Sequence, residues 1–315
     1  MKKLSNTILL VSLVILVAIF AASRLFRSPG LESNLRKDLV KVDTAVISEI
    51  RILPSKDHVE EVKVVHVGNA WKVSKGSRTE LGNTTMVKSM LSSLSNLQAQ
   101  RMASRKKEKW SDYNVGENST HVSVYQGNIR VADFHVGKLG FTQSSSGGFG
   151  GAYTYVRLSD ENEVYTVEGF LESSFNNSFD DLRDKTILKL NKVDIVRISF
   201  HYPADSSFVM DKRDSVWFIG NEIVEASKVE SFLNQFSSKY LTEFEDGFSV
   251  ERPADITLQV DGEKGGLATV EAWKKDGEWI FSSSLQKGVY FSSKGSSIVT
   301  DLLIGRKKLI QNGIK

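Results

Sequence analysis

The chain has 315 residues, long enough for two domains of ordinary size, and its 40% hydrophobic and 25% charged residues are typical of a globular protein. A formal charge of +3 argues against a dedicated nucleic-acid-binding protein, which concentrates many more Lys and Arg residues on one surface. The absence of cysteine excludes disulfides, thiolate metal sites and a lipid-modified N-terminal cysteine.

The N-terminal segment predicts membrane attachment. Lys2 and Lys3 precede an uncharged, mostly apolar stretch from Leu4 to Ser23. As a helix this stretch would cover about 30 Å, the thickness of the hydrocarbon core of a bilayer. We therefore expect residues 1–27 to form a transmembrane anchor, and the leading lysines favour a cytoplasmic N-terminus.

A cleaved signal peptide is the alternative, because Ala21-Ala22-Ser23 fits a signal-peptidase site. The apolar core is long for a signal peptide, and Leu25 and Phe26 extend it, which favours the anchor. Both readings export residues 28–315. The expected localisation is the inner membrane, crossed once, with the folded part in the periplasm.

Residues 28–41 are expected to be a polar stalk, and residues 42–180 a first α+β repeat. Its predicted elements are a strand over 46–53 and a hairpin of 62–67 with 70–73 around Gly68-Asn69. A helix capped by Asn83 or Thr84 follows. Its apolar residues recur at helical spacing and are expected in the core: Met86, Val87, Met90, Leu91, Leu94 and Leu97.

Residues 181–315 repeat this order. Trp71 and Trp217 end equivalent hairpins and lie 146 residues apart, as do Arg51 and Arg197 in the opening strands. Ser227 precedes a second helix that carries Val229, Phe232, Leu233, Phe236 and Tyr240, and later strands also match: 122–125 with 256–260, and 164–167 with 288–291. The sequence predicts two tandem repeats of a mostly antiparallel sheet with a packed helix, joined between Phe179 and Leu190, behind one N-terminal transmembrane helix. The two tryptophans are expected between sheet and helix.

Several segments of the first repeat resemble a bacterial family, the domain of unknown function numbered forty-three forty. The resemblance rests on the Trp-x-Val hairpin, the helix, Tyr113-Asn114-Val115, and three strands around Phe134–Lys138, Tyr153–Arg157 and Val164–Val167. The usual Tyr-Gly-Leu of the family is Tyr113-Asn114-Val115 here, and the strand that follows lacks the common proline. Members of the family accompany ABC transporters of the gliding-motility type, so the resemblance implies permease and ATPase subunits as partners. It implies no catalytic residues.

The glycine-rich segment Ser144–Gly151 is the most conspicuous irregular stretch. A phosphate-binding loop would need a Lys followed by Ser or Thr at the start of a helix, whereas residues 152–158 look like a strand. The segment is therefore expected to be the tip of a hairpin or a partner-binding loop.

The histidines raise the question of a metal site. If Val122 pairs with Phe134 across a Gly127-Asn128 turn, His121 lies opposite His135 and Ser123 opposite Asp133. Two imidazoles and a carboxylate could bind zinc, but the sequence places no further ligand beside them, and polar residues are expected on an open sheet face. We predict no metal and no cofactor.

No catalytic constellation is visible in the sequence, which has neither a Gly-x-Ser-x-Gly nor a His-Glu-x-x-His motif. The acidic residues Asp180, Asp181 and Asp184 lie beside Arg183 and Lys185 and are interpreted as a salt-bridged linker. Two basic runs are expected to be solvated: Arg101, Arg105, Lys106, Lys107 and Lys109, and Arg306, Lys307 and Lys308.

These features predict a non-enzymatic, membrane-anchored accessory subunit of an ABC-type transporter or gliding-motility complex. An extracytoplasmic protein that binds a small molecule or glycan in a cleft between the repeats is the first alternative. A hydrolase of exported substrates is the second, and it requires acid and base groups gathered in one cleft.

Overall fold

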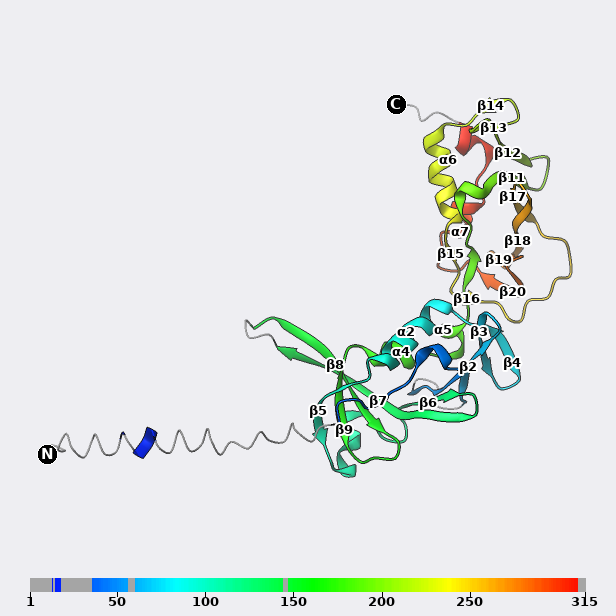
Figure 1. Cartoon of the computed structure of the whole chain (residues 1–315). Helices are drawn as coiled ribbons and strands as arrows, with labels where there is room; N and C mark the ends of the chain where they lie inside the picture. Colours follow the sequence, from blue (N-terminus) through cyan, green and yellow to red (C-terminus); the bar gives the residue numbers. More distant parts are fainter. Residues whose placement is uncertain (1–12, 14, 18–35, 56–59, 144–146, 311–315) are drawn as a thin grey trace. The chain divides into compact units, whose positions relative to one another are not determined.

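The computed structural model describes residues 13, 15–17, 36–55, 60–143 and 147–310. The chain divides into two compact units, unit 1 (1–183) and unit 2 (184–315) (Figure 1). Most of the expected anchor, residues 1–27, lies outside the described residues. Across the part of the chain that is described, no helix combines the length and apolar character needed to cross a membrane.

Unit 1 is built on a nine-stranded antiparallel sheet in the order β4-β3-β2-β1-β6-β7-β8-β9-β5. Consecutive strands are neighbours except where β1 joins β6 and where β5 returns to the far edge beside β9. The strands are β1 (Glu49–Leu53), β2 (Val62–Val67), β3 (Ala70–Lys75), β4 (Arg78–Leu81), β5 (Ala99–Ser104), β6 (Thr120–Gln126), β7 (Ile129–Gln143), β8 (Phe149–Leu158) and β9 (Val164–Glu168).

One face of this sheet is covered by α2 (Thr84–Ser95) and by the shorter α4 (Leu171–Phe175) and α5 (Phe179–Leu182). Ile50 and Ile52 occupy alternate positions of β1, so both side chains lie on one face. They are buried in the same core as Met90 and Leu94 of α2. The predicted helix is confirmed. Leu97 lies beyond its last residue but is also buried.

The expected stalk ends earlier than the sequence suggested. Leu39 and Val40 are buried in the core of unit 1, and the Leu39 N–H donates to the carbonyl of Leu97 at 3.1 Å. Burying Leu39 and Val40 removes their apolar surface from water, so the segment that follows Asp38 is part of the fold.

The side chain of Asn83 accepts hydrogen bonds from the N–H groups of Thr85 and Met86 at the start of α2. Asn83→Ala is expected to lower the free energy of unfolding of unit 1 by about 1 kcal/mol, because these N–H groups lose their acceptor. Urea denaturation measures the change. Glu225 occupies the same place before α6 (Ala226–Leu233) without a side-chain cap, so Glu225→Ala is the matched control and should change stability by less than about 0.5 kcal/mol.

Unit 2 contains a second nine-stranded antiparallel sheet, ordered β14-β13-β12-β11-β17-β18-β19-β20-β16. Position by position this is the order of unit 1, with α6 in the place of α2. The α+β prediction with two mostly antiparallel sheets is confirmed. The strands are β11 (Ile195–His201), β12 (Phe208–Arg213), β13 (Val216–Ile219), β14 (Glu222–Ile223), β16 (Glu243–Phe244), β17 (Ile256–Gly262), β18 (Gly265–Lys275), β19 (Glu278–Ser283) and β20 (Gln286–Ser292).

The opening strands correspond differently from the sequence comparison. Val64 pairs with Val73 and Met210 pairs with Ile219, and Val73 and Ile219 each lie two residues after the hairpin tryptophan. Ile50 pairs with Val64 and Ile198 pairs with Met210, so Ile50 and Ile198 are equivalent. The alignment of Arg51 with Arg197 is therefore wrong by two residues, because the β1–β2 connection is longer than the β11–β12 connection. A shift of two residues leaves each side chain on the same face, which hid the error in the apolar pattern.

The opening strand expected over 46–53 also begins later than predicted, at Glu49. Thr44–Val46 and Lys192–Asp194 form short 3-10 helices, η1 and η4, in front of β1 and β11. The second predicted helix is shorter than expected: α6 ends at Leu233, a 3-10 turn η5 (Asn234–Phe236) follows, and Tyr240 lies exposed on β15 (Lys239–Tyr240). β15 pairs with β10 (Thr186–Leu188), and this pairing ends the helix.

The acidic segment at the junction surrounds one buried charged residue of unit 1. Arg183 is 1% exposed, and its guanidinium lies 3.0 Å from a carboxylate oxygen of Asp180 and 3.8 Å from one of Glu80. Asp181 closes a capping box with Ser178 at the start of α5. The segment is salt-bridged as predicted, and it lies where unit 1 ends at residue 183 and unit 2 begins. The burial of Arg183 is the feature that its polar composition did not indicate.

Candidate functional site

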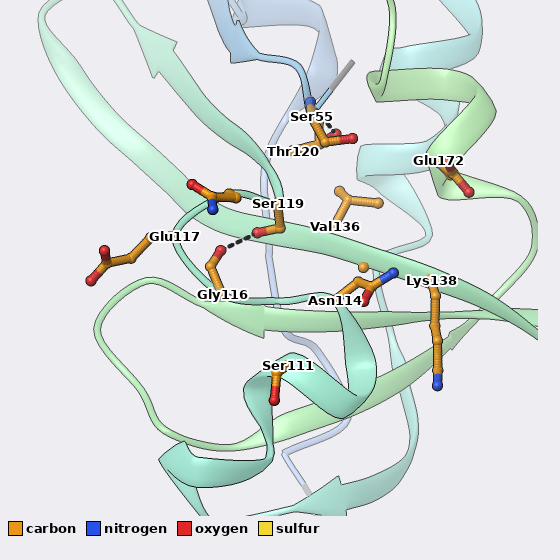
Figure 2. A pocket seen from close by; sticks show the side chains of 12 residues that line it. Ser55, Ser111, Asn114, Gly116, Glu117, Ser119, Thr120, Val136, Lys138 and Glu172 are labelled. Carbon is orange, nitrogen blue, oxygen red and sulfur yellow. Dashed lines mark hydrogen bonds between the residues drawn. The ribbon is translucent and has the colours of Figure 1, made fainter. Parts of the chain in front are cut away.

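A pocket of about 410 Å³ opens on unit 1, where the connection between β5 and β6 passes the middle of β7 (Figure 2). This connection contains η3 (Lys107–Lys109) and α3 (Trp110–Tyr113). The lining residues are mostly small and polar: Ser55, Ser111, Asn114, Gly116, Glu117, Asn118, Ser119, Thr120, Val136, Gly137, Lys138 and Glu172.

Two backbone features shape this pocket. Asn114 adopts a left-handed conformation, with φ of 55°, and its N–H closes the end of α3 on the carbonyl of Ser111. A Cβ at Gly137 would lie 2.3 Å from the carbonyl oxygen of Tyr113, so only glycine lets β7 approach the α3 turn this closely. The Tyr113-Asn114-Val115 motif thus ends α3 and forms one wall.

The charged groups of the pocket come from three elements. In Figure 2, Glu117 lies on one side, with Glu172 of α4 and Lys138 of β7 on the other. The Lys138 ammonium lies 5.9 Å from the ring centres of both Tyr113 and Tyr155, a cation–π arrangement. Because the charges are dispersed, the site offers polar contacts without a focused field.

Ser119 is the side chain at this pocket with the geometry closest to that of a nucleophile, since its Oγ lies 2.9 Å from Nδ1 of His135. The same hydroxyl donates to the carbonyl of Gly116 at 2.5 Å, and Ser119 is only 6% exposed. The Ser119 proton is thus directed at a backbone carbonyl, and the His135 imidazole contacts the hydroxyl oxygen. The pair serves to close the loop between Gly116 and Ser119.

The predicted pairing of β6 with β7 is confirmed. His121 lies opposite His135, Val122 opposite Phe134 and Ser123 opposite Asp133, and Gly127-Asn128 forms the turn. The imidazole rings stack with centres 4.7 Å apart. The register of β6 and β7 thus places His121 beside His135, as the alternation of residues along the two strands indicated.

Asp133 joins this pair to a hydrogen-bonded network. Its Oδ1 accepts from Ser123 at 3.2 Å and Ser159 at 3.0 Å and lies 2.5 Å from His121 Nε2, while Oδ2 pairs with Arg130 at 2.5 Å. Within the described residues, no group of three or more His, Cys, Asp or Glu side chains could hold a metal ion. The carboxylate is thus already held by protein donors.

The pKa of Asp133 is the net result of opposing effects. Burial raises it, but the hydrogen bond and charge of His121, together with Ser159 and Arg130, lower it below the ordinary value. A carboxyl with a depressed folded-state pKa stabilises the fold above its unfolded pKa, and this contribution is lost as pH falls through the folded value.

We therefore expect unit 1 to lose stability as pH falls below about 4, and Asp133→Asn to remove part of this dependence. Thermal unfolding of both proteins between pH 3 and pH 7 measures it. The unfolding of unit 2 in the same two proteins is the control, because Asp133 lies in unit 1 and its substitution should leave the pH dependence of unit 2 unchanged. An unchanged slope in Asp133→Asn would contradict the assignment.

Arg157 is a buried cation that the sequence analysis named only as the end of a strand segment. It is 3% exposed, its guanidinium stacks 3.9 Å above the Trp110 ring, and it donates to the carbonyls of Val115, Leu158 and Ser159. Burial lowers its pKa from the ordinary value. The side chain ties the α3 connection to β8, so it has a structural role.

The basic run after α2 is dispersed over several elements. Arg101 lies on β5, Lys107 lies 5.1 Å from the Trp110 ring centre, and Lys109 pairs with Asp112 at 2.8 Å. Arg306, Lys307 and Lys308 begin α8 (Arg306–Ile310), and Arg306 pairs with Glu222 at 2.6 Å. The first run therefore forms no single basic surface among the described residues.

The glycine-rich segment lies between β7 and β8. These strands pair as far as Gln143 with Phe149, and Gly147–Gly151 leads into β8 and not into a helix. The segment thus connects the two strands of a hairpin as predicted, but Phe149–Gly151 already belong to β8. A partner for it stays a prediction.

Comparison with known families decides the classification. The family described as a domain of unknown function (DUF4340) matches residues 71–259, more than half of the chain. The chain belongs to this family. The match runs from Trp71 in β3 through the whole α3 connection and the β7–β8 hairpin into β17. No curated protein and no solved structure gives a significant match.

Proposed function

We propose that this DUF4340 protein is a non-enzymatic, membrane-anchored accessory subunit of an ABC-type transporter or gliding-motility complex, docking outside the membrane. The observation that carries the proposal is the combination of an apolar N-terminal segment, residues 4–23, with two units of the same strand order. Residues 1–27 would be the single transmembrane helix, with the N-terminus in the cytoplasm and both units in the periplasm.

The anchor would raise the concentration of both units beside a membrane-embedded permease and its ATPase. The site on unit 1 supports a binding role more than a catalytic one. The Ser119 hydroxyl is buried and donates to a carbonyl, and Asp133 is occupied by His121, Arg130 and two serines. Transition-state stabilisation needs polar groups aimed at an accessible substrate, and these groups are aimed at one another.

Affinity purification of the full-length protein from its own membranes in a mild detergent tests the proposal. Stoichiometric recovery of a permease and an ATPase is expected. A version whose residues 1–27 are replaced by a cleavable signal peptide is the control, and it should recover these subunits far more weakly because the tether is lost.

Recovery of the full-length protein alone would contradict the accessory role. If that preparation then bound a small molecule or glycan saturably, the alternative of an extracytoplasmic binding protein would take its place. Detection of the mature protein in the cytosol would contradict both.

A further inference from the structure

The hairpin of β7 and β8 extends beyond the rest of the unit 1 sheet (Figure 1). β6 pairs with β7 only as far as Val136, and β9 pairs with β8 only from Tyr153 to Val156. Among the described residues, no third strand pairs with 140–143 or 149–152, which we call the arm. An isolated two-stranded ribbon is marginal in water, so the arm has surface available for another structure.

Unit 2 has no such extension. Its equivalent strands, β18 and β19, end in the two-residue turn Asp276-Gly277 directly after the pair Lys275–Glu278. That turn is charged and compact, as expected for a hairpin facing water. Because the two sheets share one strand order, the arm is an addition specific to unit 1 and is not needed to complete the sheet.

The chemistry of the arm differs from that of the rest of the chain. No residue from Leu139 to Val156 is charged, although one residue in four is charged overall. Phe141 is 58% exposed and Phe149 is 70% exposed, and their rings lie 5.7 Å apart. Phe149 pairs with Gln143, two residues from Phe141 on β7, so both rings lie on one face.

Side chains change character in order from the tip of the arm to its base. Phe141 and Phe149 lie toward the turn of the hairpin, whereas Tyr153, Tyr155 and Lys138 lie nearer the sheet and on the opposite face, because Tyr153 pairs with Gly140. The Tyr153 and Tyr155 hydroxyls lie 3.3 Å apart, and the Lys138 ammonium lies 5.9 Å from the Tyr155 ring centre. Phe141 and Lys138 are separated by about 10 Å of extended chain. The same sequence of apolar, amphipathic aromatic and cationic groups follows the depth of a bilayer leaflet from acyl chains through the interface to anionic headgroups.

We propose that the arm inserts the Phe141 and Phe149 side chains into the surface of a lipid bilayer. Insertion is shallow, because the outer edges of the two-stranded arm carry backbone N–H and C=O groups that need water or headgroups as partners. The arm is thus a second membrane contact beside the N-terminal anchor, and this inference rests on the anchored location in the proposed function. If the arm bound a groove of another protein, charged residues of the arm would be expected at the polar rim of that interface, and the arm has none.

The chain has no cysteine, so a single label can be placed without background. Gln143→Cys, labelled with an environment-sensitive fluorophore, reports on the tip and keeps both rings. Ile129→Cys is the matched control, because Ile129 is 70% exposed on the same strand, about 40 Å of extended chain from Phe141. Both full-length proteins are reconstituted into vesicles of phosphatidylcholine and phosphatidylglycerol.

The expected result is blue-shifted emission and protection from an aqueous quencher at Gln143→Cys, with neither change at Ile129→Cys. Adding Phe141→Ser or Phe149→Ser should lower the ratio of protected to accessible label about tenfold per ring, because each ring contributes the transfer free energy of an apolar side chain. Circular dichroism confirms that the variants keep the fold.

Three outcomes would overturn the inference, and they separate it from the proposed function. If the protein floats with the vesicles but the Gln143 label stays accessible, the anchor stands and the arm does not insert. If the label becomes protected only when a permease is reconstituted with it, a protein and not lipid covers the arm. If the protein does not float at all, both the anchor and the arm insertion fail.

Discussion

Arg183→Ala is expected to lower the free energy of unfolding of unit 1 by about 3–5 kcal/mol. Arg183 is among the largest fully buried side chains of the described chain, and it pairs with Asp180 and Glu80 and lies 5.5 Å from the Phe179 ring centre. Truncation leaves a cavity beside Phe179 and a partly buried Glu80 carboxylate without this cation.

Chemical denaturation of the full-length protein, followed by tryptophan fluorescence, measures this loss. Arg213→Ala in unit 2 is the matched control, because Arg213 also pairs with an aspartate, Asp211 at 2.7 Å, but is half exposed. An exposed pair contributes about 0–1 kcal/mol, so the control should change little. Equal effects of the two substitutions would show that burial of Arg183 does not decide the outcome.

Trp217→Ala is expected to destabilise unit 2 by about 3–5 kcal/mol, the usual range for removing a buried aromatic side chain. Trp217 is 8% exposed and lies in the core that also contains Val229 and Phe232 of α6. The substitution removes the ring on which that helix packs, which is the reason for the large effect.

Trp71→Ala offers a comparison within the same molecule. Trp71 holds the equivalent place in unit 1 but is only partly buried, with its ring 4.8 Å from that of His66. A smaller loss is expected, about half that of Trp217→Ala, because less apolar surface returns to water. Separate unfolding of the two units, monitored by hydrogen exchange, assigns each loss to its unit. A larger loss at Trp71 would contradict the assigned roles.

Local patterns were sufficient for much of the fold. The alternation of Val122 and Val124 with polar neighbours and the Gly127-Asn128 turn predicted the β6–β7 register, including His121 opposite His135. The spacing from Val87 to Leu94 predicted α2, and Asn83 was one of its two candidate caps. These features depend on residues close in the chain, whose conformations are decided by turn chemistry and side-chain periodicity.

Long-range contacts explain what was missed. Arg157 and Trp110 are far apart in the sequence, and nothing in either segment indicates that the Arg157 guanidinium stacks on the Trp110 ring. The charged run around Arg183 was interpreted as a salt-bridged linker, but the burial of Arg183 was not predicted, because the isolated bridge between Gly82 and Arg183 joins residues far apart in the sequence. The alignment of the opening strands failed at Arg197 because a slip of two residues preserves every inward side chain.

Residue patterns were enough to predict two α+β repeats with mostly antiparallel strands, the family resemblance, and a glycine-rich segment between two strands. Three further features became visible in the folded chain. Both sheets share one strand order, Ser119 and Asp133 form hydrogen bonds and ion pairs within the fold, and Phe141 and Phe149 meet on a projecting arm. The physical reason is that periodicity reports which side of an element faces the core. Which distant element covers that side depends on strand order and packing, and these are properties of the whole folded unit.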